Sequence, residues 1–283
     1  MKWDCLYDRK EGYSDEEPLV LNAVKQSKRA FVLSLSPGGG MTASGGRWIA
    51  GGQRASMYRI TGDFHAGAEW PGAQPQFGLA EHAFAVANMT SLIGRNRTWP
   101  DLDMMDLGRD SPWHNTPTAR LHAALWIMAK SPLMFAGRLP ASAQTLNLVA
   151  NPLALDIHAF SSGLTPSYQG DCSCRPFPAQ NEFACHPYNL PGRPACVAVW
   201  VSRMPNPHCR ALAVLVLGNR SATVSVPWES LGVHRGQVAN VTNIYDGLSE
   251  PSSGAGLRLD VAAQGGELLM ISPHDAEACA HSN

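Results

Sequence analysis

Two aspartates stand where carboxyl chemistry is possible. Asp4 ends a short β-like stretch, "MKWD", and Asp63 ends another, "SMYRITGD". Two carboxyl groups that converge in one pocket are what glycoside hydrolysis requires: one attacks or supports the anomeric carbon, and the other, its pKa raised by burial and by the neighbouring anion, protonates the leaving oxygen. An aspartate at a strand end is also a common cap of the next helix, so the pair alone leaves both interpretations open.

The elements that position these aspartates follow a βα pattern as far as about residue 160. The β-like runs after the opening one are "AFVLSLS" (30–36), "SMYRITGD" (56–63), "WPDLDMM" (99–105) and "SPLMFAG" (131–137). The segments between them carry apolar residues at helical spacing, as Leu121, Leu125 and Met128 do. This alternation predicts a parallel sheet or barrel.

Polar side chains lie at the ends of successive predicted strands. Counting the opening stretch, five strands end in Asp4, Ser36, Asp63, Asp103 and the region of Gly137. The carboxyl ends of the strands are where the βα loops of a (β/α)8 barrel converge to build an active site. Five strands are too few to close such a barrel, so we expect three more to precede Met1.

The pattern changes after "SSG" at 161–163. Val-rich runs bounded by Gly and Pro follow, typical of an antiparallel sandwich: "ACVAVWVS", "ALAVLVLGN", "ATVSVPW" and "GELLMISP". The predicted fold class is therefore α/β, with a partial (β/α)8 TIM barrel of about strands 4 to 8. Residues 1–160 are predicted to form this part of a catalytic barrel, and residues 161–283 a C-terminal β-sandwich domain.

Composition and charge narrow the classes of partner. The chain has 283 residues, of which 45% are hydrophobic and 16% charged, enough for one large core or two medium ones. Its net charge of -1 and scattered Lys and Arg favour neutral substrates and predict neither a nucleic-acid nor an anionic-membrane partner. The longest apolar run, "ALAVLVLG", is shorter than the ~18 residues that a membrane-spanning helix needs.

Cysteines and glycosylation signals indicate the compartment. Of seven cysteines, Cys5 stands alone in the first half, five lie between Cys172 and Cys209, and Cys279 follows. Together with Asn-x-Ser/Thr sequons at Asn88, Asn96, Asn219 and Asn240, they predict a secreted, vacuolar or lysosomal protein with disulfides. Reduced thiols and chance sequons are the alternative. "CSC" at 172–174 is not a zinc spacing, and we expect no metal.

Five segments resemble, in order and at plausible intervals, the melibiase-type α-galactosidases of glycoside hydrolase family 27: "MKWDC", "SKRAFVLSLSPGG", "ASMYRITGDF", "WPDLDMMDLG" and "ALWIMAKSPLMFAGRLP". The match runs from residue 1 to about 160 and continues loosely to the end. The resemblance implies a (β/α)8 barrel followed by an antiparallel β-sandwich. It also implies a retaining exo-glycosidase that hydrolyses terminal α-D-galactosyl residues of an oligosaccharide or glycoconjugate, needs no cofactor and could form a homodimer.

Roles carry over onto matching residues. Asp4 resembles the family's catalytic nucleophile and Asp63 its general acid/base, with Lys2 and Arg59 as donors to sugar hydroxyls. Both cations would also hold Asp4 ionised. We expect the carboxylates of Asp4 and Asp63 to face each other across one pocket, with Lys2, Arg59 and Asp103 around the opening. Arg59 could instead pair with a structural carboxylate.

Other matches and departures refine these expectations. Asp103 and Met104 match seventh-strand positions that line the pocket floor, and Cys5 resembles a family cysteine bridged to a partner just upstream. The first three strands, which carry further galactose contacts in the family, have no counterpart here, so this chain alone is expected to turn over α-galactosides poorly or not at all. Ser36 replaces a Glu of the animal-type enzymes. The roomier pocket makes an α-N-acetylgalactosaminidase an alternative, as is a non-catalytic sugar-binding or structural fragment.

Overall fold

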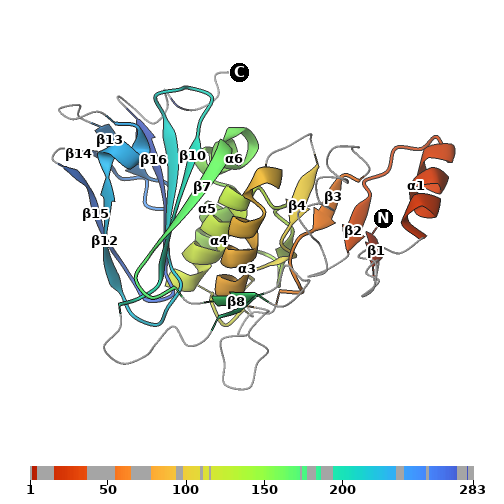
Figure 1. Cartoon of the computed structure of the whole chain (residues 1–283), viewed down its shortest axis with the longest axis horizontal. Helices are drawn as coiled ribbons and strands as arrows, with labels where there is room; N and C mark the ends of the chain where they lie inside the picture. The colour runs from red at the N-terminus through yellow and green to blue at the C-terminus, as the bar shows by residue number, and fades with distance from the viewer. Residues whose placement is uncertain are drawn as a thin grey trace. The chain divides into compact units, whose positions relative to one another are not determined.

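The computed structural model (Figure 1) describes residues 2–4, 16–36, 55–64, 78–93, 98–108, 111–114, 116–172, 174–176, 183–185, 194–233, 239–252, 255–272 and 279. The chain divides into two compact units. The first comprises Met1–Met104, Lys130–Met134 and Cys174–Cys185, and the second Met105–Ala129, Phe135–Ser173 and His186–Asn283. The domain boundary predicted at residue 160 stays a prediction.

A parallel sheet is the centre of the first unit. Its strands are β1 (Lys2–Asp4), β2 (Ser34–Ser36), β3 (Met57–Arg59) and β4 (Trp99–Asp101), in that order across the sheet. All three neighbouring pairs are parallel. Helix α1 (Glu16–Gln26) lies between β1 and β2 in sequence, and α3 (Leu79–Asn88) between β3 and β4. The predicted βα repetition and parallel pairing are confirmed here, with strands shorter than the sequence runs.

The register of this sheet separates a polar face from an apolar one. Leu35 pairs with Tyr58, and both are almost fully buried. Side chains alternate between the two faces of a strand, so Ser36 and Arg59 lie on the face opposite to Leu35 and Tyr58. Asp101 pairs with Arg59 and therefore shares its face. The polar face thus carries a hydroxyl, a guanidinium and a carboxyl group, which are able to take part in binding or catalysis.

The run predicted as a strand at 131–137 forms only a short one. In the second unit, β6 (Phe135–Ala136) pairs in parallel with β5 (Met105–Asp106) as a separate two-stranded sheet. Directly after this pair the two backbones come close: a Cβ on Gly108 would lie 2.4 Å from the Cα of Gly137. Only glycine fits such an approach without moving the backbone.

Antiparallel strands dominate the second unit, as predicted. One sheet has the order β14-β13-β16-β11-β10-β7, and a two-stranded sheet pairs β12 with β15. The bounds are β7 (Ser162–Gln169), β10 (Val197–Arg203), β11 (Arg210–Val216), β12 (Ala222–Pro227), β13 (Ala239–Asn243), β14 (Ser249–Ser252), β15 (Gly256–Val261) and β16 (Gly266–Ser272). The pairs within the larger sheet are all antiparallel.

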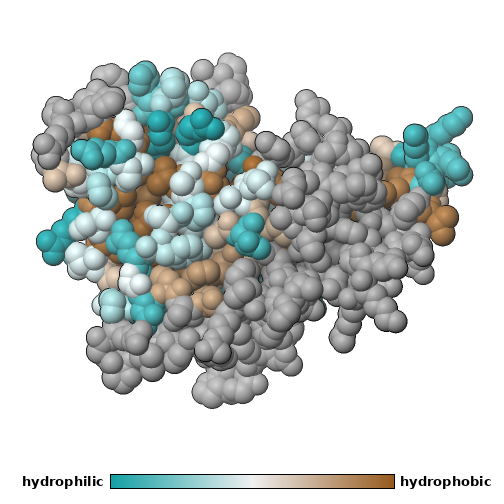
Figure 2. All heavy atoms as spheres, in the orientation of Figure 1, coloured by the Kyte–Doolittle hydropathy of each residue, from teal (hydrophilic) through white to brown (hydrophobic). Residues whose placement is uncertain are grey.

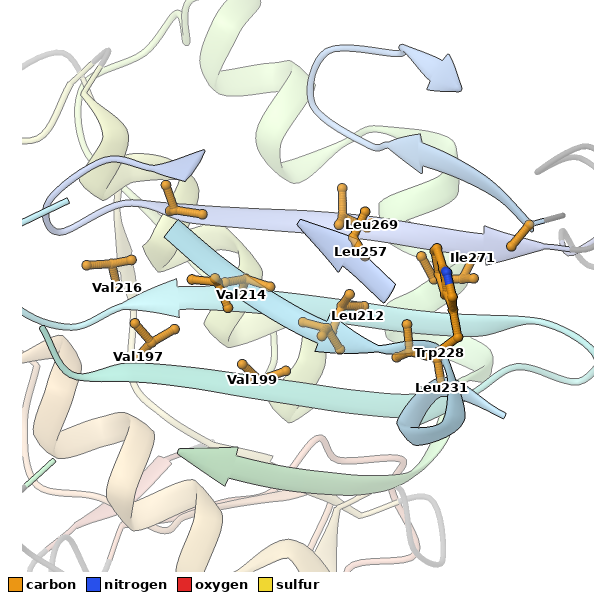
Figure 3. Packing of buried hydrophobic residues seen from close by; sticks show 14 of the residues in the cluster. Val197, Val199, Leu212, Val214, Val216, Trp228, Leu231, Leu257, Leu269 and Ile271 are labelled. Atoms are coloured by element: carbon orange, nitrogen blue, oxygen red, sulfur yellow. The ribbon is translucent and has the colours of Figure 1, made fainter. Parts of the chain in front are cut away.

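Apolar side chains of the two sheets form one core, shown in Figure 3. Val199 and Val214 of the six-stranded sheet belong to the same buried cluster as Val226 and Leu257 of the two-stranded sheet. The two sheets therefore pack face to face. Trp228, in the short 3-10 helix η4 (Trp228–Leu231) that follows β12, lies in this cluster as well.

Helix α4 (Pro117–Ala129) packs on β11 and β16. A Cβ on Gly266 would lie 2.4 Å from the Cα of Leu121, so helix and strand are in backbone contact. Gly266 pairs with Leu215, which is buried like Val214 and Val216 beside it. Strand β11 is thus buried on both faces, which explains why its sequence is a continuous apolar run without polar alternation.

Helices, short strands and disulfides complete the described parts. Helix α5 (Ala143–Val149) is capped by Ser142, and α6 (Pro152–Phe160) by Asn151. Strands β8 (Cys174–Pro176) and β9 (Phe183–Cys185) pair in antiparallel in the first unit, and a 3-10 helix, η3 (Thr90–Leu92), follows α3. The second unit contains the disulfides Cys172–Cys196 and Cys209–Cys279, which confirms the prediction that the protein has disulfides. Cys5 lies outside the described residues.

The described surface carries mixed residue types. Figure 2 shows hydrophilic and hydrophobic residues interspersed over the visible face of the second unit. None of the helices that the structure describes has the length and apolar character needed to cross a membrane.

Candidate active site

A row of polar positions crosses the carboxyl ends of the four parallel strands. Asp4 pairs with Ser36, and Arg59 pairs with Asp101. Ser36 stands next to Arg59 because the residues before them, Leu35 and Tyr58, are partners. The backbone thus places four chemically capable residues side by side, in the order of their strands. The side chain of Asp4 lies outside the described part of the chain.

Arg59 links two of the predicted site residues. Its side chain is 1% exposed, and its Nη1 lies 3.2 Å from Oδ2 of Asp103. Its Nη2 lies 3.3 Å from Oδ1 of Asp63 and also donates to the backbone carbonyls of Gly62 and Thr61. A buried guanidinium needs such carboxylate and carbonyl partners to offset its lost hydration. The structure therefore brings together three of the predicted residues.

Asp103 is held by its surroundings in an uncommon conformation. Its backbone has φ 80°, a left-handed value that few non-glycine residues adopt. Its Oδ2 accepts the backbone N–H of Phe64 at 2.9 Å, in addition to the ion pair with Arg59. Its own N–H is donated to Oδ1 of Asp101 at 2.8 Å. The preceding N–H, of Leu102, is donated to Oγ of Ser131 at 2.9 Å.

Asp63 differs from its partners in exposure. Its side chain is 70% exposed, whereas that of Asp103 is 13% exposed. It follows β3 by four residues, and its contact with Arg59 is an i,i+4 pair that runs back along the chain. One side of this carboxylate is thus fixed by a buried cation while the remainder is open to solvent. A group placed in this way can meet a ligand that arrives from solution.

Asp101 belongs to this cluster, although the sequence did not single it out. The residue is 2% exposed, and burial raises the pKa of its carboxyl above the ordinary value. The charge of Arg59, the N–H of Asp103 and the charge of Lys2 act in the opposite direction and lower that pKa. A signal was present in "WPDLD", because this motif carries two aspartates at the end of a predicted strand. Only the second, Asp103, is a predicted site residue.

His82 lies in α3 beside the cluster. It is 1% exposed, its Nδ1 lies 2.8 Å from the carbonyl oxygen of Gly78, and its ring meets that of Phe64 edge-on at 5.3 Å. Burial, followed by the positive charge of Arg59, lowers the pKa of His82 to about 3. The ring is therefore neutral at neutral pH and adds no positive charge beside Arg59. The sequence gave no sign that His82 lies beside this cluster, since the residue belongs to an ordinary apolar helix pattern.

The other predicted residues have different environments. Ser36 is 4% exposed, whereas Met104 is 45% exposed. Lys2 is exposed, and its charge acts on the pKa of Asp101 as described above. The predicted approach of the Asp4 and Asp63 carboxylates stays a prediction. Among the residues that the structure describes, no group of three or more His, Cys, Asp or Glu side chains could hold a metal ion.

Comparisons with known proteins bear on this site. No family model matches the chain. Over 145 residues, 49% of the chain, it is 27% identical to probable α-galactosidase B of Emericella nidulans, and this covers 31% of that protein. Among solved structures, it resembles the family 27 β-L-arabinopyranosidase of Geobacillus stearothermophilus, with 22% identity and a TM-score of 0.72. It also resembles α-galactosidase I of Mortierella vinacea, with 18% identity and a TM-score of 0.69.

These similarities bear on the fold of the chain and on the family that its motifs resemble. The matches to the two solved structures cover 96% and 99% of this chain, so its fold is similar to a part of each of these glycosidases. The chain is thus similar in sequence to an α-galactosidase and in fold to enzymes of glycoside hydrolase family 27, in agreement with the resemblance found in its motifs. It spans only 57% of the arabinopyranosidase and 68% of the Mortierella enzyme.

Proposed function

We propose that this chain carries the catalytic carboxylates of a retaining exo-glycosidase that hydrolyses terminal α-D-galactosyl residues. The observation that carries the proposal is the buried Arg59, which joins Asp63 and Asp103 next to the strand-end row that contains Asp4. Such clusters of carboxylates around a buried cation at the carboxyl ends of parallel strands are typical of active sites. Two of the relatives are α-galactosidases by name.

The architecture that we propose around this site is part of a (β/α)8 barrel. The four parallel strands pair in chain order, as neighbouring strands of such a barrel do. Their polar face would be the barrel interior, and their apolar face, with Leu35 and Tyr58, would pack against the surrounding helices. In a barrel, side chains from strands two apart can converge above the axis, which would bring Asp4 towards Asp63.

The proposed roles follow from the chemistry of each group. Asp4 attacks the anomeric carbon and forms a glycosyl-enzyme, while Asp63 protonates the leaving oxygen and then deprotonates the attacking water. This sequence requires the two carboxyl groups to lie ~5–5.5 Å apart. Asp63 suits the second role because its carboxylate is exposed on one side and oriented by Arg59 on the other.

Arg59 has two possible roles, and its burial distinguishes them. A side chain that is 1% exposed has little access to a sugar, and its Nη atoms already contact Asp63 and Asp103. We therefore assign it to orienting these two carboxylates, which is closer to the structural pairing considered from the sequence. Lys2, which is exposed, is left as the donor to sugar hydroxyls, with Asp103 and Met104 at the pocket floor.

An α-N-acetylgalactosaminidase is the second candidate. The observation that favours it is Ser36, a short side chain between Asp4 and Arg59 in the strand-end row. Where a larger residue would fill this position, serine leaves room for the acetamido group at carbon 2 of the sugar. Rates on p-nitrophenyl α-galactoside and on the matching N-acetylgalactosaminide decide between the two activities.

The test of the acid/base assignment uses the longest natural form of the protein, since its relatives are longer than this chain. Asp63→Asn is expected to slow substrates with poor leaving groups far more than activated aryl glycosides, because only the former need a proton. Asp4→Asn should abolish both reactions. Glu250→Gln, an exposed carboxylate in β14, is the matched control and should change neither. Equal losses on both substrate types with Asp63→Asn would contradict the assignment.

A further inference from the structure

The sequon Asn219-Arg220-Ser221 occupies an exposed bend. It lies between β11, which ends at Val216, and β12, which begins at Ala222, and all three of its residues are exposed. Leu217 before it is buried, so the change from core to surface takes place within two residues. The sequon is therefore accessible from solvent.

The bend is anchored at its base. The N–H of Leu217 is donated to the carbonyl of Cys196 at 2.9 Å, and the carbonyl of Gly218 accepts the N–H of Gln264 at 2.8 Å. Cys196 is itself joined to Cys172 by a disulfide. The backbone on both sides of the sequon is therefore anchored, while the sequon itself is exposed to solvent.

The sequon at Asn240 has the opposite environment. Asn240 is half-buried in β13, where it is paired with Pro251 of β14 on one side and Ser272 of β16 on the other. The hydroxyl of its sequon belongs to Thr242, which is 5% exposed and bonds to the hydroxyl of Ser249 at 3.0 Å. A large glycan at Asn240 would have to fit beside two neighbouring strands.

The sequon at Asn88 is intermediate. Asn88 is exposed, but it is the last residue of α3, and Met89 within the sequon is fully buried. The sequon backbone is thus tied to a packed helix end. Asn96 lies outside the described residues.

The disulfides indicate that this unit matures in an oxidising compartment. Cys172–Cys196 and Cys209–Cys279 lie in the same unit as Asn219. Such bonds form and persist in oxidising compartments, among them the endoplasmic reticulum, where Asn-x-Ser/Thr sites are glycosylated. This observation is independent of the sequon and of its exposure.

We propose that Asn219 is an N-glycosylation site of the folded protein. The donor is a lipid pyrophosphate that carries an oligosaccharide. A bond forms between the Asn219 side-chain nitrogen and the anomeric carbon of the first sugar, the bond from that carbon to the pyrophosphate oxygen breaks, and the amide proton is lost. The lipid pyrophosphate is the leaving group, and no oxidant or reductant takes part.

The test directs the 283-residue chain into the secretory pathway of a eukaryotic host with an added leader. The secreted protein is treated with an amidase that removes N-glycans in heavy-oxygen water, which converts each glycosylated Asn into labelled Asp. Peptide mass spectrometry is expected to find the label at Asn219 and to find Asn240 unlabelled. Label at Asn240 or Asn88 with none at Asn219 would overturn the proposal.

Variants give a second measurement. Ser221→Ala removes the sequon and keeps Asn219, so it should lose one glycan-sized step in gel mobility. Ser221→Thr restores the acceptor pattern and should restore that step. Because Ser221 is exposed, neither change should disturb folding. Unchanged mobility in Ser221→Ala, with the protein still secreted, would count against glycosylation at Asn219.

Discussion

The carboxylate of Asp101 accepts the backbone N–H of Asp103 at 2.8 Å and so stabilises a left-handed backbone at that residue, with φ 80°. In this conformation the side chain of Asp103 reaches Arg59 at 3.2 Å. The left-handed region is costly for most residues that carry a Cβ, and aspartate is among those that tolerate it best. The buried carboxylate of Asp101 thus determines the direction of the Asp103 side chain.

Two substitutions at Asp101 should distinguish the contribution of its hydrogen bond from the contribution of its charge. Asp101→Ala leaves the N–H of Asp103 without its acceptor in a buried place and is expected to lower the free energy of unfolding by about 1–3 kcal/mol. Asp101→Asn keeps an oxygen that can accept this N–H, so it should cost less. Urea unfolding of both variants measures the difference. Equal losses would show that the hydrogen bond to Asp103 is not what Asp101 contributes.

The sequence predicted some of the residues around Arg59 and missed others. Asp63 and Asp103 were identified because they end β-like runs within specific motifs, and the structure places both on Arg59. Asp101 was missed because its importance comes from burial and from the register with Arg59, and neither is visible in a single sequence. His82 was missed for the same reason, since nothing in the helix pattern shows which ring meets Phe64.

The larger elements were predictable where one physical signal was strong. The apolar run at 211–216 was predicted as a strand of the antiparallel sandwich, and β11 is such a strand. The structure adds that it is covered by α4 and by the second sheet. The run at 131–137 forms a strand only at Phe135–Ala136. There the pattern was ambiguous, because a short apolar run between prolines and glycines is compatible with several extended conformations.

His82 should make stability fall in mild acid. The pKa of His82 is lowered from 6.5 to about 3 in the folded protein, mainly by burial. Between these values the unfolded chain binds a proton at this residue and the folded chain does not, so stability is lost as pH falls from 6.5 towards 3. The slope attributable to one such group is at most about 1.4 kcal/mol per pH unit.

His82→Gln should flatten this dependence. The free energy of unfolding is measured between pH 7 and pH 5, above the range in which most carboxylates titrate. His208→Gln is the matched control, because His208 is exposed, and the wild-type slope should persist in it. A slope in His82→Gln as steep as that of the wild type would contradict the assignment to His82.

Gly266→Ala should destabilise the contact between α4 and β16. A Cβ at this position would lie 2.4 Å from the Cα and 2.9 Å from the N of Leu121, so a helix backbone would have to move. Overpacking of this kind costs typically about 1–3 kcal/mol. Chemical denaturation should show a loss in this range or above it.

Gly247→Ala is the comparison for Gly266. Gly247 has φ 67°, and a Cβ there would meet nothing within 4 Å, so only backbone strain opposes the substitution. That strain is of the order of 1–2 kcal/mol. If Gly247→Ala were the more damaging of the two changes, the close approach of α4 to β16 would not be the main constraint on Gly266.

Arg120 of α4 forms ion pairs with Asp246, which follows β13, and with Glu267 of β16. Its removal should change the free energy of unfolding in a pH-dependent way. Its Nη1 lies 3.0 Å from Oδ2 of Asp246 and 3.3 Å from Oε2 of Glu267, and that oxygen also accepts from Nδ2 of Asn243 at 2.8 Å. Burial raises the pKa of Glu267, whereas Asn243 and the charge of Arg120 lower it. Without Arg120, the half-buried carboxylate of Glu267 would keep the hydrogen bond from Asn243 but would lose a neighbouring positive charge.

Arg120→Leu should therefore raise the pKa of Glu267 further. An acid whose pKa is higher in the folded than in the unfolded state loses stability as pH rises through that window. The loss of unfolding free energy in the variant, relative to the wild type, should thus be larger at pH 7 than at pH 4, and about 1–3 kcal/mol at pH 7.

The double variant is the control for this prediction. Arg120→Leu combined with Glu267→Leu removes the unpaired carboxylate and should recover part of the loss. Urea unfolding at both pH values measures all three proteins. A deficit of the same size at both pH values, with no recovery in the double variant, would mean that Arg120 does not act through Glu267. Its ion pair with Asp246 and its packing over the ring of Tyr245, whose centroid lies 5.7 Å from the guanidinium carbon, would then account for the loss.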